Sequence, residues 1–114
     1  MSDNSEPPIE ISVGEVHRLQ QNDETFLFLD VRNPDEHQTA SIEGTTLIPM
    51  NELVDRAGEL EPHRGDRIIV HCHHGGRSLQ VTQWLRNQGF SKAQNMTGGI
   101  EAWSGQIDPS VPRY

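Results

Sequence analysis

The sequence has only one cysteine, Cys72, so it cannot form an internal disulfide. It is also poor in basic residues. It has 9 lysines and arginines but 17 aspartates and glutamates, which gives a formal net charge of −8. This acidic balance argues against a nucleic-acid partner, which calls for a basic face, and against an anionic membrane surface. With 114 residues, the chain has room for one domain, a single sheet covered by helices.

Long apolar stretches are missing as well. No run approaches the ~18 apolar residues needed to span a bilayer, and residues 1–8 lack the basic and apolar regions of a signal peptide. Since neither a disulfide nor an export signal is expected, we predict a cytoplasmic location. We also expect a flexible tail over residues 1–8, one domain over residues 9–105 and an irregular tail over residues 106–114.

Short apolar runs alternate with helical patterns along the chain. We expect strands at residues 9–11, 26–29, 45–48, 67–71 and 93–96, helices at residues 12–19, 33–36, 51–57, 79–88 and 98–103, and a turn at residues 61–66. This alternation predicts an α/β sandwich with a mostly parallel sheet, in which sites lie at the carboxyl ends of strands. Cys72 follows one strand directly. Asp30 and Arg32 directly follow another strand, and they either form a structural ion pair or contact a substrate.

Cys72 opens a segment that we call the nucleophile loop, residues 72–78, with the sequence Cys-His-His-Gly-Gly-Arg-Ser. The strand before it aims the thiol out of the sheet edge, and the glycines let backbone N–H groups turn inward. A helix start adds partial positive charge and free N–H donors, and Arg77 adds a planar fork of donors. Each of these favours the thiolate, which is the reactive form of cysteine.

Two other interpretations of this cysteine are weaker. A cysteine that only fills the core needs neither the Gly-Gly turn nor an arginine five positions further on. A metal site would use the cluster of His71, Cys72, His73 and His74, but a second cysteine is missing and neighbouring side chains point apart along a loop. We therefore expect neither a metal nor another cofactor.

The nucleophile loop fits the pattern C-x-x-G-x-R-S and resembles the active-site loop of rhodanese-like sulfurtransferases. Residues 29–37 resemble the D-V-R-x-x-x-E-[FY] block of that family, and residues 97–103 resemble its G-G-x-x-x-W block. The resemblance covers residues 9–105, with His37 in place of the usual aromatic and residues 40–42 reading Ala-Ser-Ile instead of Gly-His-Ile. It implies a three-layer sandwich, with helices on both faces of a mostly parallel five-stranded sheet.

The resemblance also implies a mechanism. Cys72 takes the outer sulfur of a small anionic donor such as thiosulfate, becomes a persulfide, and passes the sulfur to a thiol, to cyanide or to a protein acceptor. Cys72 and Arg77 are then the catalytic residues, and the other members of the loop bind the substrate, namely His73, His74, Gly75, Gly76 and Ser78. Arg77 either contacts the donor or locks the loop through backbone carbonyls. Ser78 donates to the thiolate, caps the following helix, or does both.

Some roles stay open at this point. His73 and His74 either assist an anion at the rim or are simply solvated. His71 is expected to be structural, and Trp84 and Trp103 are expected in the core.

Two other classes of function compete with sulfur transfer. Cysteine phosphatases and arsenate reductases also combine a cysteine, a turn and an arginine, but with one more residue between cysteine and arginine than the four found here. The shorter loop makes a smaller cradle, which suits one sulfur atom better than a tetrahedral phosphate. The other class is a non-enzymatic interaction module, or a relay that moves sulfur between proteins.

Overall fold

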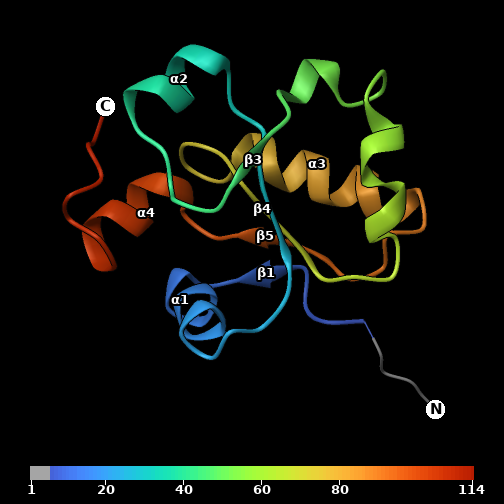
Figure 1. The fold of residues 1–114 in the computed structure, drawn as a ribbon, viewed down its shortest axis with the longest axis horizontal. Helices are drawn as coiled ribbons and strands as arrows, with labels where there is room; N and C mark the ends of the chain where they lie inside the picture. Colours follow the sequence, from blue (N-terminus) through green and yellow to red (C-terminus); the bar gives the residue numbers. More distant parts are fainter. Residues whose placement is uncertain (1–5) are drawn as a thin grey trace.

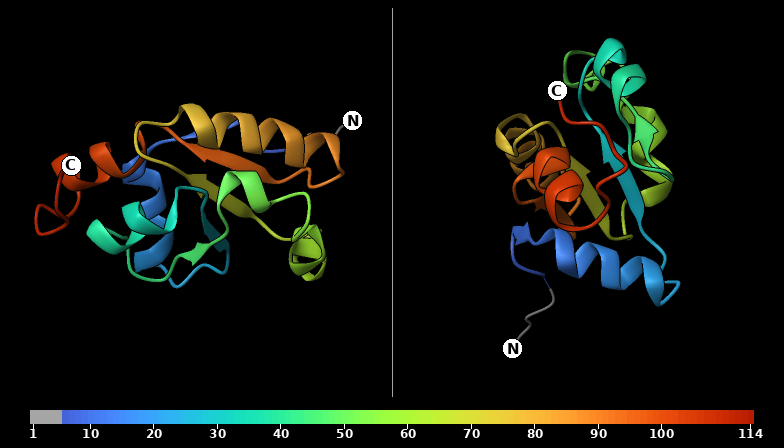
Figure 2. Two further views of the ribbon diagram at one scale, coloured as in Figure 1. Left: turned by 90° about the horizontal axis from the view of Figure 1, so that it is seen from above. Right: turned by 90° about the vertical axis from the view of Figure 1, so that its left-hand side faces the viewer.

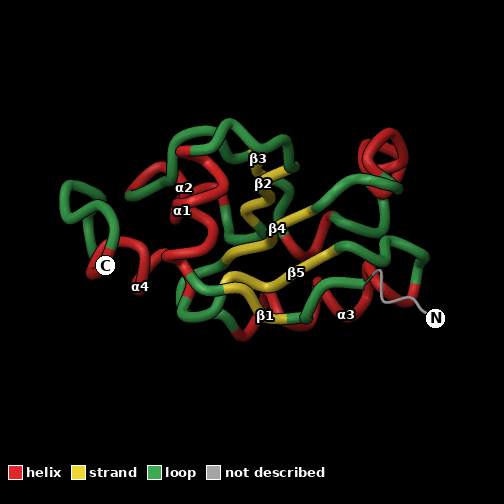
Figure 3. Tube along the Cα trace, turned by 90° about the horizontal axis from the view of Figure 1, so that it is seen from below, coloured by secondary structure: helices red, strands yellow, loops and turns green. Residues whose placement is uncertain are grey.

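The computed structural model describes residues 6–114. Within them, five strands form one sheet in the order β1-β5-β4-β2-β3, which Figure 3 shows from below. The strands are β1 (Glu10–Ile11), β2 (Leu27–Asp30), β3 (Thr46–Leu47), β4 (Ile68–His71) and β5 (Ala93–Met96). Each neighbouring pair is parallel, and β4 is the middle strand. The predicted parallel, five-stranded sheet is confirmed.

Helices cover both faces of this sheet (Figure 1). They are α1 (Val13–Gln21), α2 (Pro34–Thr39), α3 (Gly76–Asn87) and α4 (Gly99–Gln106), with the 3₁₀ helices η1 (Met50–Glu52) and η2 (Ala57–His63). Ile68 and Val70 of β4 join the apolar cluster of α3 and η2, whereas Ile69 joins that of α1 and α4. Because successive side chains of a strand point to opposite faces, β4 feeds both clusters. The three-layer sandwich is thus confirmed (Figure 2).

Helix α3 begins earlier than the sequence pattern predicted. The apolar stripe placed its start at residue 79, but the helix begins at Gly76, directly after Gly75. Gly75 has a φ of 111°, in the left-handed region that glycine adopts without steric cost. This turn leads from the end of β4 straight into the helix, so Arg77 and Ser78 lie in its first turn.

The prediction of one helix over residues 51–57 is wrong. The structure has η1, a series of turns, and then η2, which runs into the turn expected over residues 61–66. Leu53 and Leu60 are buried here, but Val54 is 75% exposed, so these apolar residues do not share one helical face. Pro62 also lacks the N–H that a longer α-helix would use.

The N-terminal end of the described chain is bound to the domain by two side chains. The carbonyl of Pro7 accepts a hydrogen bond from Arg86 Nη2 (2.7 Å), and that of Pro8 accepts one from Gln94 Nε2 (2.9 Å). Of the tail expected over residues 1–8, residues 1–5 lie outside the described part of the chain.

The last segment, residues 107–114, forms no helix or strand and is fastened to α4. Ser104 Oγ donates to the carbonyl of Val111 (2.6 Å), and Arg113 Nε donates to Glu101 Oε2 (2.9 Å). These contacts bring the end of the segment to the nucleophile loop. In the part of the chain that the structure describes, no helix is both long and apolar enough to cross a membrane.

Candidate active site

Cys72 lies where β4 ends, in the middle of the carboxyl edge of the sheet, and is only 1% exposed. Its sulfur accepts hydrogen bonds from the backbone N–H of Gly75 (3.1 Å), from the backbone N–H of Ser78 (3.4 Å) and from the Ser78 hydroxyl (3.3 Å). Inward N–H donors were expected from the loop, and the structure directs these two at the sulfur. The loop therefore forms a small anion cradle around one sulfur atom.

The donors around Cys72 favour its thiolate. Burial of the sulfur opposes ionisation and by itself raises the pKa of the Cys72 thiol. Hydrogen bonds from the Ser78 hydroxyl and from the backbones of Ser78, Gly75 and His74 act in the opposite direction and leave the pKa of Cys72 below its ordinary value. The first turn of α3 adds partial positive charge at the same place. Cys72 therefore has the ionisable sulfur that a nucleophile needs.

The G-G-x-x-x-W block holds the backbone of the loop. The N–H groups of Ile100 and Glu101 donate to the carbonyls of Cys72 (2.9 Å) and His73 (3.1 Å). A side chain at Gly99 would come within 2.5 Å of both carbonyl oxygens, so only glycine lets α4 approach the loop this closely. The start of α4 thereby fixes the position of the nucleophile.

Arg77 binds Glu36 of α2 rather than the loop backbone. Its Nη1 and Nη2 donate to the two carboxylate oxygens of Glu36 at 2.7 and 2.9 Å, and its side chain remains 35% exposed. The bond to Arg77 is the main reason that the pKa of Glu36 falls to about 2. The pKa of Arg77 is raised, chiefly by Glu36 and in part by the charge of Cys72. Sequence reasoning missed Glu36 as a partner, although it lies in the D-V-R-x-x-x-E block.

Tyr114 covers the rim of the loop. Its ring stacks on His73, with centroids 3.9 Å apart and planes 10° from parallel, and His73 stacks in turn on His74 at 3.9 Å. The Tyr114 hydroxyl donates to Glu36 Oε2 (2.9 Å) and accepts from Arg32 Nη1 (2.8 Å). Burial also lowers the pKa of His73. No sequence motif signalled Tyr114, because it lies in the segment expected to be an irregular tail.

Asp30 and Arg32 form a buried ion pair behind the site. Arg32 Nε and Nη2 donate to the two Asp30 oxygens at 2.9 and 2.7 Å, and both side chains are fully buried. Arg32 Nη2 also donates to the carbonyl of Ala40 (2.7 Å), and His37 Nδ1 lies 2.9 Å from Asp30 Oδ2. These contacts agree with the structural interpretation of this pair. They hold the C-terminal part of α2, the helix that presents Glu36 to Arg77.

His71 and the two tryptophans have the structural surroundings that were expected. His71 is fully buried, its Nδ1 lies 3.2 Å from the carbonyl oxygen of Cys72, and burial lowers its pKa to about 4. The imidazole is therefore neutral at pH 7. Trp103 is buried in the cluster of α1 and α4, and Trp84 packs against the cluster on the other face.

One group of side chains near the loop has metal-ligating atoms close together. His73, His74 and Glu101 each offer one such atom, and these lie within 4.8 Å of one another. These side chains make other contacts, however. Arg113 binds Glu101, and the ring of His73 is stacked between those of His74 and Tyr114. The expectation of no metal stays a prediction.

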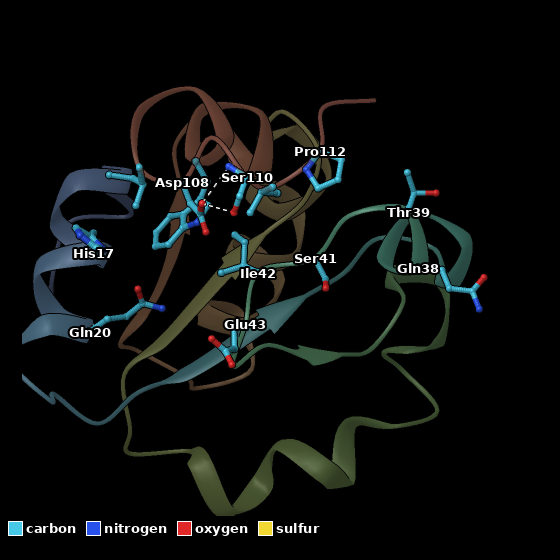
Figure 4. A pocket seen from close by; sticks show the side chains of 13 residues that line it. His17, Gln20, Gln38, Thr39, Ser41, Ile42, Glu43, Asp108, Ser110 and Pro112 are labelled. Atoms are coloured by element: carbon cyan, nitrogen blue, oxygen red, sulfur yellow. Dashed lines mark hydrogen bonds between the residues drawn. The ribbon is translucent and has the colours of Figure 1, made fainter.

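A cavity of about 710 Å³ lies apart from the sulfur site. Figure 4 shows its walls, with His17 from α1, Ile42 and Glu43 from the loop after α2, and Asp108 from the last segment. None of the described residues that line it belongs to the nucleophile loop. The chemistry of Cys72 is therefore not located in this cavity.

Comparison with known proteins agrees with this geometry. The rhodanese-like domain matches residues 12–106. The chain is 39% identical over 117 residues to the chloroplastic rhodanese-like/PpiC domain-containing protein 12 of Arabidopsis thaliana, covering 96% of this chain and 38% of that protein. It is 35% identical over 107 residues to the putative sulfur carrier protein YrkF of Bacillus subtilis, covering 94% of this chain and 57% of that protein. The chain thus spans less than two thirds of these relatives.

A solved structure of similar size gives a fuller match. The chain superposes on the human single-domain sulfurtransferase TSTD1 with a TM-score of 0.79 and 26% identity. The superposition covers 88% of this chain and 98% of the human one.

Proposed function

This chain belongs to the family of rhodanese-like domains, as the three sequence motifs predicted, and we propose that it is a sulfurtransferase that carries sulfane sulfur on Cys72. The observation that carries the proposal is the convergence of the Gly75 and Ser78 donors on one buried sulfur. Donors placed to stabilise a thiolate also stabilise a persulfide, since both are anions. The match to a human sulfurtransferase over nearly all of that protein supports the same reaction class.

The proposed reaction has two steps. The Cys72 thiolate attacks the outer sulfur of a donor such as thiosulfate, a new sulfur–sulfur bond forms, and the old one breaks with its electron pair leaving on sulfite. In the second step a nucleophile, either a thiolate or cyanide, attacks the terminal sulfur of the persulfide. The bond to Cys72 then breaks, and the thiolate is regenerated.

Arg77 is proposed to receive the anionic end of the donor. Glu36 engages its Nη1 and Nη2 groups, which leaves the Nε–H and further N–H groups of the partly exposed guanidinium available to an anion. Since Glu36 keeps the guanidinium in one orientation, these groups are positioned before a donor arrives. We therefore assign Arg77 to binding of the substrate rather than to holding the loop through its backbone carbonyls.

The acceptor is proposed to be a thiol, cyanide or a protein that accepts sulfur. A relative of this chain is named a putative sulfur carrier protein, which supports a protein-to-protein relay as a form of the same chemistry. The loop length and the sulfurtransferase relatives favour sulfur transfer over phosphate chemistry.

The test is to incubate the purified protein with thiosulfate and measure its mass. We expect the protein to gain one sulfur atom, to lose it to cyanide with formation of thiocyanate, and to do neither as the Cys72→Ser variant. The proposal is wrong if the wild-type protein gains no sulfur from thiosulfate or from a low-molecular-weight persulfide. Equal thiocyanate formation by the serine variant would exclude the covalent mechanism.

A further inference from the structure

A single hydroxyl lies between the sulfur of Cys72 and a buried amide. Ser78 Oγ is 3.3 Å from Cys72 Sγ and 2.5 Å from Asn95 Oδ1. Both Ser78 and Asn95 are buried, so water does not replace either partner. A hydroxyl has only one proton, and it cannot donate at full strength to both acceptors.

The orientation of the Asn95 amide is fixed by its other neighbours. Its Nδ2 donates to Glu10 Oε1 (2.9 Å) and to the carbonyl of Gly75 (3.3 Å). Both of these groups are acceptors, so a flipped amide would turn its oxygen toward two other oxygens. Glu10 is held in place by strand register, since it pairs with Asn95 across β1 and β5, and by Thr97 Oγ1, which donates to Oε1 at 2.7 Å. The amide oxygen must therefore face Ser78.

We propose that Asn95 is a positioning residue that competes with the Cys72 sulfur for the proton of Ser78, and that Glu10 orients it for this task. In the neutral form, the Ser78 proton lies on the bond to Asn95, and the thiol donates its own proton to Ser78 Oγ. When the thiol loses its proton to solvent, the Ser78 hydroxyl turns toward the sulfur and gives up the bond to Asn95. Formation of the thiolate therefore requires loss of the hydrogen bond between Ser78 and Asn95, which makes the thiolate less favourable. The same loss disfavours the persulfide anion.

Asn95 also reaches the second donor of the cradle. Its Nδ2 binds the carbonyl of Gly75, whose own N–H donates to the sulfur. The amide therefore contacts both Gly75 and Ser78, whose donors lie 3.1 to 3.4 Å from the sulfur. No motif of the sequence marked Asn95, which lies on the strand expected over residues 93–96.

The other charged groups near the loop lie on different elements. Arg77 lies on α3 and is neutralised by Glu36 of α2, His73 and His74 lie in the loop, and Glu10 lies on β1. A test must therefore separate the Ser78 route from the through-space effect of these charges. A double-mutant cycle does this, because only the first effect needs the hydroxyl of Ser78.

The experiment measures the pKa of Cys72 from the pH dependence of alkylation by iodoacetamide, with no sulfur donor present. We expect Asn95→Ala to lower this pKa by about half to one unit, since Ser78 then donates to the sulfur without competition. In a Ser78→Ala background the same change is expected to shift the pKa much less, because only the contact of Asn95 with the Gly75 carbonyl then connects it to the sulfur. Gln94→Ala is the matched control, because Gln94 is a buried amide on the same strand that binds Pro8 instead, and it should leave the profile unchanged.

A second variant keeps the test valid if Asn95→Ala does not fold. Glu10→Gln keeps the size of an exposed side chain but weakens the hold on the amide, so we expect a smaller shift in the same direction. With Ser78→Ala this shift should shrink to the through-space effect of the lost charge. A shift as large in the Ser78→Ala background as in the wild-type background, a raised pKa, or no shift in either variant overturns the proposal. The role of Asn95 in sulfur transfer rests on the proposed function. The alkylation profile, however, is measured without sulfur transfer, so the experiment can contradict this inference and the proposed function independently.

Discussion

Replacing Glu36 by glutamine should destabilise the protein in a way that depends on pH. The pKa of Glu36 is about 2 against an ordinary value of 4.5, and at about 1.4 kcal/mol for each unit of pKa this is worth about 3 kcal/mol. Because Arg77 is 35% exposed, solvent screening reduces the value to about 2 kcal/mol. We therefore expect Glu36→Gln to lower the free energy of unfolding at pH 7 by about 2 kcal/mol.

The sign of the pH dependence follows from the lowered pKa. A carboxyl whose pKa is depressed in the folded state stabilises the fold above its ordinary pKa, and this stability is lost as the pH falls from 4.5 toward 2. The difference between wild type and Glu36→Gln should therefore be constant above about pH 5 and disappear near pH 2. Urea unfolding at several pH values measures it, with Glu24→Gln as a control for an exposed glutamate. A difference that stays constant down to pH 2 would refute the assignment of this stability to the carboxylate.

Two further predictions concern the rim of the nucleophile loop. Arg77→Lys keeps the charge but loses the planar fork that holds Glu36, so we expect most thiocyanate formation to be lost with an unchanged circular dichroism spectrum, and wild-type kinetics would remove Arg77 from the site. Tyr114→Phe keeps the ring on His73 but loses the bonds to Glu36 and Arg32, so we expect a loss of about 1 kcal/mol of stability by urea unfolding. Tyr114→Ala should in addition speed alkylation of the thiol, and equal rates for the two variants would show that the ring does not shield it.

The sheet and the nucleophile loop could be predicted because their signals are local. An apolar run followed by a polar loop marks β4. The helix expected over residues 12–19 is α1, and Ser12 caps it by accepting a bond from the N–H of Glu15 (3.1 Å). The segment after Asn51 shows the limit of the same reasoning. Its apolar residues have a helical spacing, but the structure buries Leu53 and exposes Val54, so these two neighbours do not pack on the same side.

The partners of the loop could not be predicted in the same way, because they come from distant parts of the chain. Arg77 and Glu36 are 41 positions apart, and Tyr114 and Glu36 are 78 apart. Asn95 and Glu10 are 85 positions apart and meet only through the pairing of β1 with β5. A single sequence has no local pattern that marks such pairs, so the loop itself could be predicted, but its distant partners Glu36, Asn95 and Tyr114 could not.

The short loop explains why the guanidinium of Arg77 and the hydrogen-bond donors around Cys72 have separate tasks. With four residues between Cys72 and Arg77, the arginine falls in the first turn of α3 and its guanidinium turns toward Glu36 of α2. The sulfur is left with donors from Gly75 and Ser78, which is enough for one added sulfur atom but too few for the three equatorial oxygens of a phosphoryl group in transfer. The sulfur transfer proposed above fits this division, since sulfite would leave at the rim while the charge of the persulfide would stay in the cradle. We infer that the short loop favours sulfur over phosphate, because it directs the guanidinium to Glu36 and leaves the donors of Gly75 and Ser78 on the sulfur.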